Sequence, residues 1–303
     1  MQVIRQALHP APNPSPSRGG GFPAAIEISF EVLAWNKGMT YRFTILGCGS
    51  SGGVPRIGMN WGQCDPLNPK NRRTRCSALV ERVSKAGQTA VLIDTSPDFR
   101  EQILSIRLMA LDGVIYTHDH ADHTHGIDDL RMVAYAMKKR VDVYFDARTG
   151  DSLKQRFAYC FKAAEGSNYT PILTAHDIDG VSPFTIAGAG GPIPVLPVPQ
   201  VHGDISSLGL RVSNLAYSPD ISDLTDASAA LLEGLDVWVV DALRYTPHES
   251  HFHVKQALKW IARLKPKRAV LTHMTSDLDS ETLRRELPEG VEPAYDGMVV
   301  EFT

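Results

Sequence analysis

With 303 residues, a formal net charge of −3 and 43% hydrophobic residues, the sequence describes a globular chain with one large core or two small ones, and it excludes a disordered or fibrous protein. The near-neutral charge and the absence of long Lys/Arg blocks argue against a protein that binds nucleic acid through its phosphates alone. No apolar run approaches the roughly 18 to 20 residues that span a bilayer, and the first residues lack a signal-peptide pattern, so we expect a cytoplasmic protein with no membrane contact. The four cysteines are scattered, so we expect reduced thiols.

The first 39 residues differ in composition from the rest of the chain. The segment APNPSPSRGGGFP is rich in Pro, Gly and Ser and shows no periodicity, which is typical of a flexible lead-in. Met39 directly precedes the first strand pattern and is an alternative start of translation. We therefore predict a flexible N-terminal extension over residues 1–39 and one folded domain over residues 40–303, with an ordered N-terminal arm as the alternative.

From residue 41 onward, short β-branched runs alternate with helical patterns. Strands are predicted at Tyr41–Leu46, Ala78–Arg82, Ala90–Ile93, Gly113–Tyr116, Val141–Phe145, Ile193–Val198, Leu208–Val212, Val237–Val240 and Ala269–Leu271. Helices are predicted at Asp98–Leu104, His125–Met137, Gly150–Phe157, Asp223–Leu232, Val254–Leu264 and Ser280–Glu286. Two strand-rich halves with helices between them predict an α/β fold in which two sheets pack on each other and the helices lie outside.

A dense polar motif, THDHADHTHGIDDLR, follows a predicted strand and occupies residues 117–131. His118 and His120 are two residues apart in extended chain and project from the same side, and Asp122 and His123 follow where the chain turns into a helix. Imidazoles and a carboxylate gathered at the end of a strand bind a divalent metal well, whereas a surface loop without metal is the alternative. Four neighbouring residues are interpreted as flanking the site: Asp119, His125, Asp128 and Asp129.

Single polar residues also follow three later strand patterns. These are His202 in PVPQVHGD, Asp220 in LAYSPDIS and His273 in AVLTHMTS. Each alone is more often a cap or a surface residue than a ligand. Together they form a series of metal-ligand types at strand ends.

At these residues the chain resembles the metallo-β-lactamase superfamily, whose HxHxDH signature matches residues 118–123. The resemblance extends from residue 41 to residue 303 and implies an αββα sandwich that holds two divalent metal ions, zinc or manganese. It implies a first metal ion on His118, His120 and His202, a second on Asp122, His123 and His273, and Asp220 bridging both.

Four further stretches, LGCGSSGGVPRIG, RCSALVE, LTHMTS and DGMVVEF, resemble the phosphoribosyl 1,2-cyclic phosphate phosphodiesterase branch of that superfamily. This resemblance implies hydrolysis of a small cyclic or nucleotide-like phosphodiester by attack of a metal-bridging hydroxide, with Asp220 as a catalytic residue. It also implies that His251, in HESHFHVKQAL, protonates the leaving oxygen. His248 and His253 stay open as alternatives because they are close in sequence.

In that branch, cysteines after the GVP turn and a late histidine hold a separate structural zinc ion. Here Met59 and Trp61 occupy two of the cysteine positions, Ser276 stands at the histidine position, and only Cys64 remains. A closed structural site needs four ligands. We therefore predict no structural zinc and expect Cys64 to be a small buried apolar residue.

Other charged residues are candidates for supporting roles. Asp94 and Asp241 end strand patterns, where a carboxylate orients ligand imidazoles or simply caps a turn. The guanidinium group matches phosphate geometry, although ordinary solvated charge is the alternative for each candidate. The candidate substrate-binding arginines are Arg72, Arg73, Arg75 and Arg131. The Gly-rich GCGSSGGVP lacks the Lys-Ser/Thr of a nucleotide P-loop and is expected to form a tight turn beside the metal cleft.

Three competing functions are weighed against the phosphodiesterase. A tRNA 3′-processing endonuclease needs a protruding basic arm, and residues 141–202 offer only a short insertion with few basic residues. A non-hydrolytic pyrroloquinoline-quinone-biosynthesis protein is suggested by TSPDFREQI, but such proteins usually have a degraded HxHxDH. A module that binds nucleotides without turnover is the third. We expect a small phosphodiester or nucleotide as substrate rather than a nucleic acid, and a homodimer is compatible with the sequence.

Overall fold

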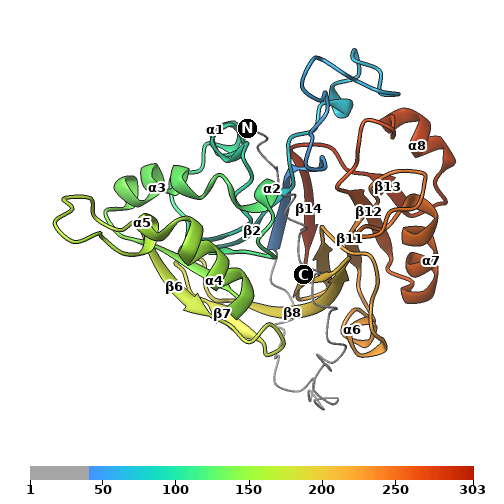
Figure 1. Cartoon of the computed structure of the whole chain (residues 1–303). Coiled ribbons are helices and arrows are strands. Elements are labelled where there is room, and N and C mark those ends of the chain that lie inside the picture. Colours follow the sequence, from blue (N-terminus) through green and yellow to red (C-terminus); the bar gives the residue numbers. More distant parts are fainter. Residues whose placement is uncertain (1–40) are drawn as a thin grey trace, which may run out of the picture. The chain divides into compact units, whose positions relative to one another are not determined.

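The computed structural model describes residues 41–303, so the extension predicted at residues 1–39 and the alternative start at Met39 lie outside the described residues. Two seven-stranded sheets dominate this part of the chain (Figure 1). The first sheet has the order β14 (Met298–Phe302), β1 (Tyr41–Gly47), β2 (Ser77–Ser84), β3 (Gly87–Ile93), β4 (Gly113–Ile115), β5 (Val141–Phe145) and β6 (Leu173–Asp177). The second has the order β13 (Val291–Pro293), β12 (Arg268–Thr272), β11 (Val237–Asp241), β10 (Leu215–Ser218), β9 (Ile205–Val212), β8 (Ile193–His202) and β7 (Phe184–Ile186).

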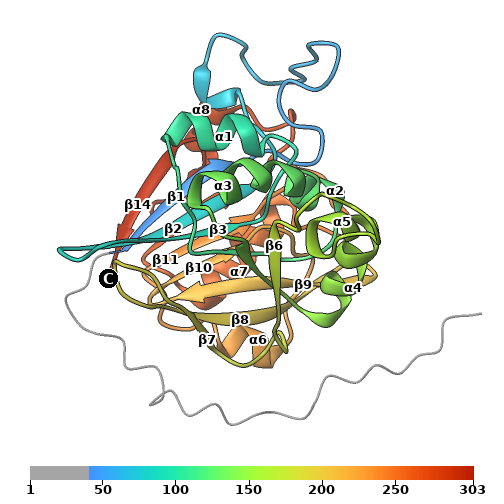
Figure 2. The same ribbon diagram turned by 90° about the vertical axis from the view of Figure 1, so that its left-hand side faces the viewer.

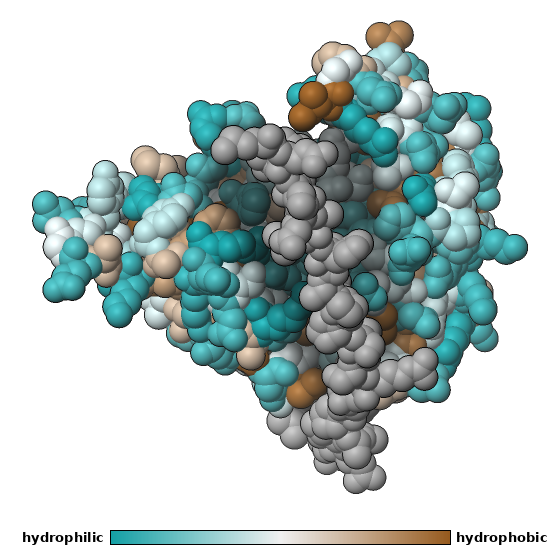
Figure 3. Space-filling model, in the orientation of Figure 1, coloured by the Kyte–Doolittle hydropathy of each residue, from teal (hydrophilic) through white to brown (hydrophobic). Residues whose placement is uncertain are grey.

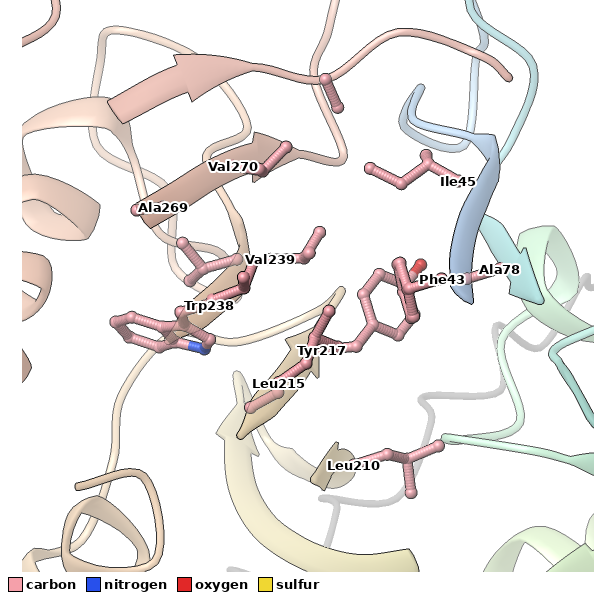
Figure 4. Close-up of a cluster of buried hydrophobic side chains, with 14 of the residues drawn as sticks. Phe43, Ile45, Ala78, Leu210, Leu215, Tyr217, Trp238, Val239, Ala269 and Val270 are labelled. Atoms are coloured by element: carbon pink, nitrogen blue, oxygen red, sulfur yellow. The ribbon is translucent and has the colours of Figure 1, made fainter. Parts of the chain in front are cut away.

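The main hydrophobic core lies between the two sheets. Phe43 on β1 meets Tyr217 on β10 with ring centroids 5.4 Å apart, and Val239 on β11 lies on the same face as Tyr217, whereas Trp238 points to the outer face (Figure 4). All five residues of β11 are buried because the strand lies inside its sheet, with the core on one face and helix on the other. The apolar runs that predicted these strands therefore become the inner layers of the fold.

Helices cover the outer faces of both sheets (Figures 1 and 2). On the first sheet these are α1 (Phe99–Ile106), α2 (Ala121–Thr124), α3 (Leu130–Met137), α4 (Ala147–Arg156) and α5 (Ala158–Phe161), with the 3₁₀ turn η3 (Ile127–Asp129). On the second they are α6 (Asp226–Ala230), α7 (Val254–Leu264) and α8 (Ser280–Glu286). The α7 stripe Val254, Ala257 and Ile261 packs inward at helical spacing. The predicted αββα sandwich is confirmed.

Some predicted boundaries are wrong. The helix predicted from His125 begins earlier, because residues 121–124 already form α2, and the segment is then interrupted by η3 before α3 starts. The helix predicted from Asp223 starts only at Asp226, because the Thr225 side chain accepts a hydrogen bond from the Ser228 amide and caps the start of α6.

Among the described residues, no helix is both long and apolar enough to cross a membrane.

Parallel strands bring their carboxyl ends to one edge of each sheet. In the first sheet β3, β4 and β5 run parallel, and in the second β10, β11 and β12 do so. Loops at the carboxyl ends of parallel strands are where α/β folds assemble their sites. Residues 94, 118–123, 220, 241 and 273 all follow these strand ends or end the strand itself.

Candidate metal centre

The described structure brings all seven residues proposed as metal ligands together. The ligand atoms of His118, His120, His202 and Asp220 lie within 4.8 Å of one another. The ligand atoms of Asp122, His123 and His273 form a second such group. The short helix α2 explains the compact spacing of the HxHxDH motif, because it turns Asp122 and His123 back beside the histidines that precede it.

Asp220 lies between the two groups and presents one carboxylate oxygen to each. Its Oδ2 is 3.8 Å from Nε2 of His118 and 3.5 Å from Nε2 of His202. Its Oδ1 is 2.9 Å from Nε2 of His123 and 3.5 Å from Nε2 of His273. This is the arrangement of a carboxylate shared by two coordination sites.

Several buried atoms that face this cluster make no hydrogen bond of acceptable geometry among the described residues, although Oδ1 of Asp220 and Nε2 of His123 lie 2.9 Å apart. They are Nε2 of His118, Nε2 of His123, Nε2 of His273 and Oδ1 of Asp220. A buried polar atom without a partner is costly, so such atoms need an explanation. Imidazole nitrogens and carboxylate oxygens that converge on one space are a donor set for divalent metal ions. The residues therefore fit a metal centre.

The far sides of three ligand imidazoles are held by polar partners, and the first is Nδ1 of His118, which lies 3.0 Å from Oγ1 of Thr117. His123 Nδ1 lies 2.8 Å from Asp94 Oδ2, and the same carboxylate accepts hydrogen bonds from the amide and the hydroxyl of Thr117, both at 2.8 Å. His202 Nδ1 donates to the carbonyl oxygen of Ser250 at 2.6 Å. Such contacts fix the ring and direct the other nitrogen inward. Asp94 thus takes the orienting position that the sequence suggested for it.

The backbone is strained next to the cluster. Asp94 has φ of +61° and His273 has φ of +57°, a region that residues other than glycine rarely adopt. Both residues come directly after a strand, so the left-handed conformation turns each chain sharply at the sheet edge. Strain of this kind is kept where the surrounding structure requires a particular side-chain position.

Burial and neighbouring charges shift the pKa values of the cluster in different directions. Burial lowers the pKa of His118 well below its ordinary value and that of His202 to about 4. For His123, burial also acts to lower the pKa, but the surrounding carboxylates, Asp220 foremost, raise it well above its ordinary value. For Asp220, burial opposes ionisation, yet His123 and His273 hold its pKa well below the ordinary value. The Asp220 carboxylate is therefore ionised and the imidazoles of His118 and His202 are neutral, as metal ligands must be.

His251 lies beside the ligands and is held by a carboxylate of its own. Its Nδ1 is 2.7 Å from Asp241 Oδ2, and its Nε2 is 3.9 Å from Asp220 Oδ2. The His251 ring stacks on the ring of His273 with centroids 4.6 Å apart, and burial lowers the pKa of His251. Asp241 was expected to orient a ligand imidazole, but its contact with His273 Nδ1 is longer, 3.8 Å. Its main partner is His251.

The metal cluster forms the floor of a cleft of about 320 Å³. His248 and His251 line this cleft, whereas His253 does not and serves as the N-cap residue of α7. His248 is exposed on the rim and its ring centroid is 5.2 Å from that of His251. Of the three histidines left open by the sequence, His251 alone lies next to Asp220.

The prediction that Arg73 binds substrate is wrong. Its side chain is buried, and its guanidinium donates to the carbonyl oxygens of Thr275 at 3.1 Å and Leu278 at 2.7 Å. The guanidinium also lies 3.8 Å from Sγ of Cys64, which is buried as predicted. Arg73 therefore fastens the loop around Cys64 to the segment after His273.

The other three predicted arginines do not line the cleft either. Arg75 pairs with Asp98 at 3.0 Å, and Arg131 pairs with Asp128 at 2.7 Å within the turn that precedes α3. Arg72 is exposed outside the cleft. These contacts correct the prediction, because a short distance in sequence from a motif does not place a long side chain in the cleft.

Two arginines that the sequence did not single out line the cleft instead. Arg56 follows the cis peptide bond Val54–Pro55 in the GVPRIG stretch, and Arg244 lies on the loop after β11. The stretches GCGSSGGVPRIG and VVDALR already contain them, and a search for arginines near each carboxylate at a strand end would have found Arg244 beside Asp241. Ser51 and Gly52 also line the cleft, so the Gly-rich turn does flank it as expected.

Comparison with known proteins decides the family. A model described as the beta-lactamase superfamily domain matches residues 89–274. The chain belongs to the metallo-β-lactamase superfamily. A solved diphosphatase of the PhnP family has 36% sequence identity and a TM-score of 0.76, with 87% of this chain and 98% of that one covered. This likeness confirms the predicted branch of the metallo-β-lactamase superfamily.

Two curated relatives differ in their names. An octanoyltransferase of Porphyromonas gingivalis is 32% identical over 260 residues, which are 85% of this chain but only 51% of that protein, so the chain spans about half of its length. Coenzyme PQQ synthesis protein B of Xanthomonas campestris is 27% identical over 237 residues, 69% of this chain and 75% of that protein. These two names and that of the diphosphatase describe different roles. Substrate specificity within this metallo-β-lactamase fold therefore has to be argued from the residues of the cleft.

Proposed function

We propose that this protein is a phosphodiester hydrolase that works with two divalent metal ions, zinc or manganese. The observation that carries the proposal is Asp220, whose two oxygens face two different groups of ligand atoms. The mixture of imidazoles and carboxylates suits zinc and also tolerates manganese or iron. Two bound cations would activate water and neutralise the charge of a phosphoryl group.

Asp241 orients the His251 ring, and His251 supplies the proton for the leaving group. Asp241 accepts from Nδ1 of His251 and leaves its Nε2 directed at the space above Asp220. A leaving alkoxide needs a proton, and an imidazole in this position delivers one from Nε2. Burial lowers the pKa of His251, which makes its protonated form a stronger acid. The Asp241–His251 pair is thus suited to protonate the leaving oxygen of a substrate bound on the floor.

The similarity to a diphosphatase widens the substrate class to nucleotide-like diphosphates, in which the bond attacked also joins a phosphorus and an oxygen. A second candidate function, a non-hydrolytic role in cofactor synthesis, is favoured by the similarity to coenzyme PQQ synthesis protein B. The complete ligand set and the adjacent Asp241–His251 pair favour hydrolysis over that role.

The test is a substrate panel with defined metal content. Metal-free protein is reconstituted with zinc, manganese or iron and assayed on bis(p-nitrophenyl) phosphate, cyclic nucleotides, a phosphoribosyl cyclic phosphate, a dinucleoside diphosphate and a precursor tRNA. We expect metal-dependent turnover of the small substrates. Cleavage of the tRNA alone would favour the endonuclease, and no turnover of any substrate with full metal content would favour the non-hydrolytic role.

A further inference from the structure

The cleft above the metal cluster has two walls of different character. On the first wall, Arg56 and Asn60 exchange backbone hydrogen bonds at 2.9 and 3.2 Å and close a hairpin. Ile57 and Leu67 on the segment that projects from this wall are highly exposed, and apolar side chains coloured brown stand out on this projection in Figure 3. The second wall is the loop of residues 244–251, whose cleft-lining residues are an arginine and two histidines. The second wall therefore concentrates hydrogen-bonding groups beside the metal cluster.

The loop that carries His248 is closed at its base and braced from within. Leu243 N donates to Phe252 O at 2.9 Å, which joins the two ends of the loop. Inside the loop, Nη2 of Arg244 donates to the carbonyl oxygen of Pro247 at 2.9 Å. The residue directly before His248 is thus held by a side chain, which restricts the positions that His248 can take.

Ser250 fixes two histidines through its backbone. Its amide donates to Nδ1 of His248 at 3.2 Å, and its carbonyl oxygen accepts from Nδ1 of the ligand residue His202 at 2.6 Å. The Ser250 hydroxyl also lies 3.2 Å from Nδ1 of His248. A Cβ on Gly203 would lie 2.8 Å from Cβ of Ser250, so the loop after β8 packs directly on the loop of His248. His248 is therefore held in a defined position relative to the metal cluster.

The contact with Ser250 determines which nitrogen of His248 carries the proton. A backbone amide only donates, so Nδ1 is the acceptor and the neutral ring carries its proton on Nε2. Burial lowers the pKa of His248, and the nearby His251 and Arg244 lower it further against the opposing effect of Glu249, which favours the neutral ring. Nε2 has no hydrogen-bond partner among the described residues. A neutral N–H donor is thus left for a ligand in the cleft.

His248 and His251 are neighbours with different partners. Nδ1 of His251 faces the Asp241 carboxylate, which supports a protonated ring, whereas Nδ1 of His248 faces an amide, to which a protonated ring could not bond. His251 is therefore suited to give up a proton, and His248 is suited to give only a hydrogen bond. Their ring centroids are 5.2 Å apart, so both rings can reach one phosphoryl group.

We propose that Nε2–H of His248 donates a hydrogen bond to an oxygen of the phosphoryl group that is attacked, which makes His248 a catalytic residue but not an acid. The inference rests on the proposed hydrolase function and adds a residue to its machinery. A donor that is already fixed in place stabilises the charge on phosphoryl oxygens in the transition state without having to be oriented first.

Two amide variants separate donation from the structure of the loop. In His248→Asn, the side-chain oxygen takes the place of Nδ1 and can still accept from the Ser250 amide, but no group reaches the place of Nε2. In His248→Gln, the longer side chain brings an amide N–H to the place of Nε2. We expect kcat/KM to fall by roughly 10- to 100-fold in the Asn variant, the range for a hydrogen bond to a charged group, and to recover in part in the Gln variant.

The matched control removes an imidazole outside the cleft. His176 pairs with Asp142 at 2.8 Å on the edge strand β6 and does not line the cleft, so His176→Ala is expected to keep the wild-type kcat/KM. Metal content and melting temperature are measured for each metal-loaded, full-length variant.

The leaving group separates this role from that of His251. A contact with a phosphoryl oxygen assists every leaving group, so we expect His248→Asn to lose equally on bis(p-nitrophenyl) phosphate and on a cyclic nucleotide that the protein cleaves. A loss confined to the cyclic nucleotide would assign proton donation to His248 and overturn the proposal.

Three further results decide the matter. Wild-type kcat/KM in His248→Asn, or equal losses in the Asn and Gln variants, overturns the proposed donor. Loss of bound metal in His248→Asn also overturns it, because the residue would then act by supporting His202 through Ser250. Absence of turnover by the wild-type protein on the whole panel, with full metal content, removes the hydrolase proposal itself.

Discussion

The floor and the rim of the cleft are built in different ways. On the floor, the ligand residues are mostly buried, and three of their imidazoles have a polar partner on the side away from the cleft: Thr117 for His118, Asp94 for His123 and the Ser250 carbonyl for His202. On the rim, Arg56 is exposed and its guanidinium has no partner among the described residues. The difference indicates a preorganised floor, in which neighbouring groups fix the side chains, and a rim on which the Arg56 guanidinium makes no hydrogen bond among the described residues.

Removal of the shared carboxylate on the floor has the largest expected effect. In Asp220→Asn, neither group of ligands retains the charged oxygen between them, so we expect loss of metal and turnover at background level. Metal analysis and the diester assay measure both. Asp119→Asn is the matched control within the same motif, because Asp119 accepts a hydrogen bond from Ser152 and is not among the clustered ligand atoms. A fully active Asp220→Asn protein would contradict the bridging role.

His251 lies between floor and rim, and its removal separates proton donation from metal binding. His251→Ala is expected to keep its metal and to lose about 10²- to 10⁴-fold in turnover of substrates with alkoxide leaving groups. The loss on bis(p-nitrophenyl) phosphate is expected to be much smaller, since nitrophenolate leaves without a proton. Equal losses on both kinds of substrate, or loss of metal, would exclude the acid role.

Replacement of Asp94, the carboxylate that holds the His123 ring from behind, is expected to have a smaller effect. Asp94→Asn replaces an acceptor of three hydrogen bonds by an amide, so the His123 ring is held less well. We expect metal affinity to fall by about 10- to 100-fold, measured by competition with a chelator. In the control Asp112→Asn, the altered group lies directly before β4 and accepts a hydrogen bond from the Ala90 amide in the middle of β3. Metal affinity should not change there, and an equal drop in both variants would indicate a general loss of stability.

The raised pKa of His123 predicts the smallest signal, a proton released on metal binding. A raised pKa keeps the imidazole protonated at neutral pH in the metal-free protein, and the metal needs the neutral ring, so affinity falls as the pH falls. His118 and His202, whose pKa values are lowered, contribute no proton there. Calorimetry at pH 7 in buffers of different ionisation enthalpy should show net release of protons on metal binding. No proton release would contradict this protonation state.

The sequence predicted the floor well and the rim poorly, for a physical reason. His118 and His273 follow apolar strands that pair in parallel with their neighbours, and His202 ends the apolar strand β8, so the carboxyl ends of these strands place the ligands at the sheet edges. A long arginine side chain has no such constraint. Arg73 is buried by carbonyl groups about two hundred residues away in the chain, and Arg56 reaches the cleft only because a hairpin closes behind it.

Two smaller differences between the sequence predictions and the structure have the same cause, because loop folding is not encoded in the apolar pattern. Asp241 was recognised as an orienting carboxylate from its place at the end of β11, but its partner His251 depends on how the following loop folds back. The helix starts within the HxHxDH motif, sooner than its apolar periodicity indicates, because the first turn, α2, contains the polar ligand residues Asp122 and His123. Apolar patterns locate the core, and they do not show how polar loops close over it.

A metal titration coupled to turnover tests the central claim most directly. Metal-free protein is titrated with manganese or zinc while bound metal and hydrolysis of one cleaved diester from the panel are measured in the same samples. Our account predicts that activity rises with occupancy and reaches its maximum at two ions per chain, because Asp220 joins two ligand groups. Full activity at one ion, or full occupancy at two ions without hydrolysis of any substrate in the panel, would contradict it.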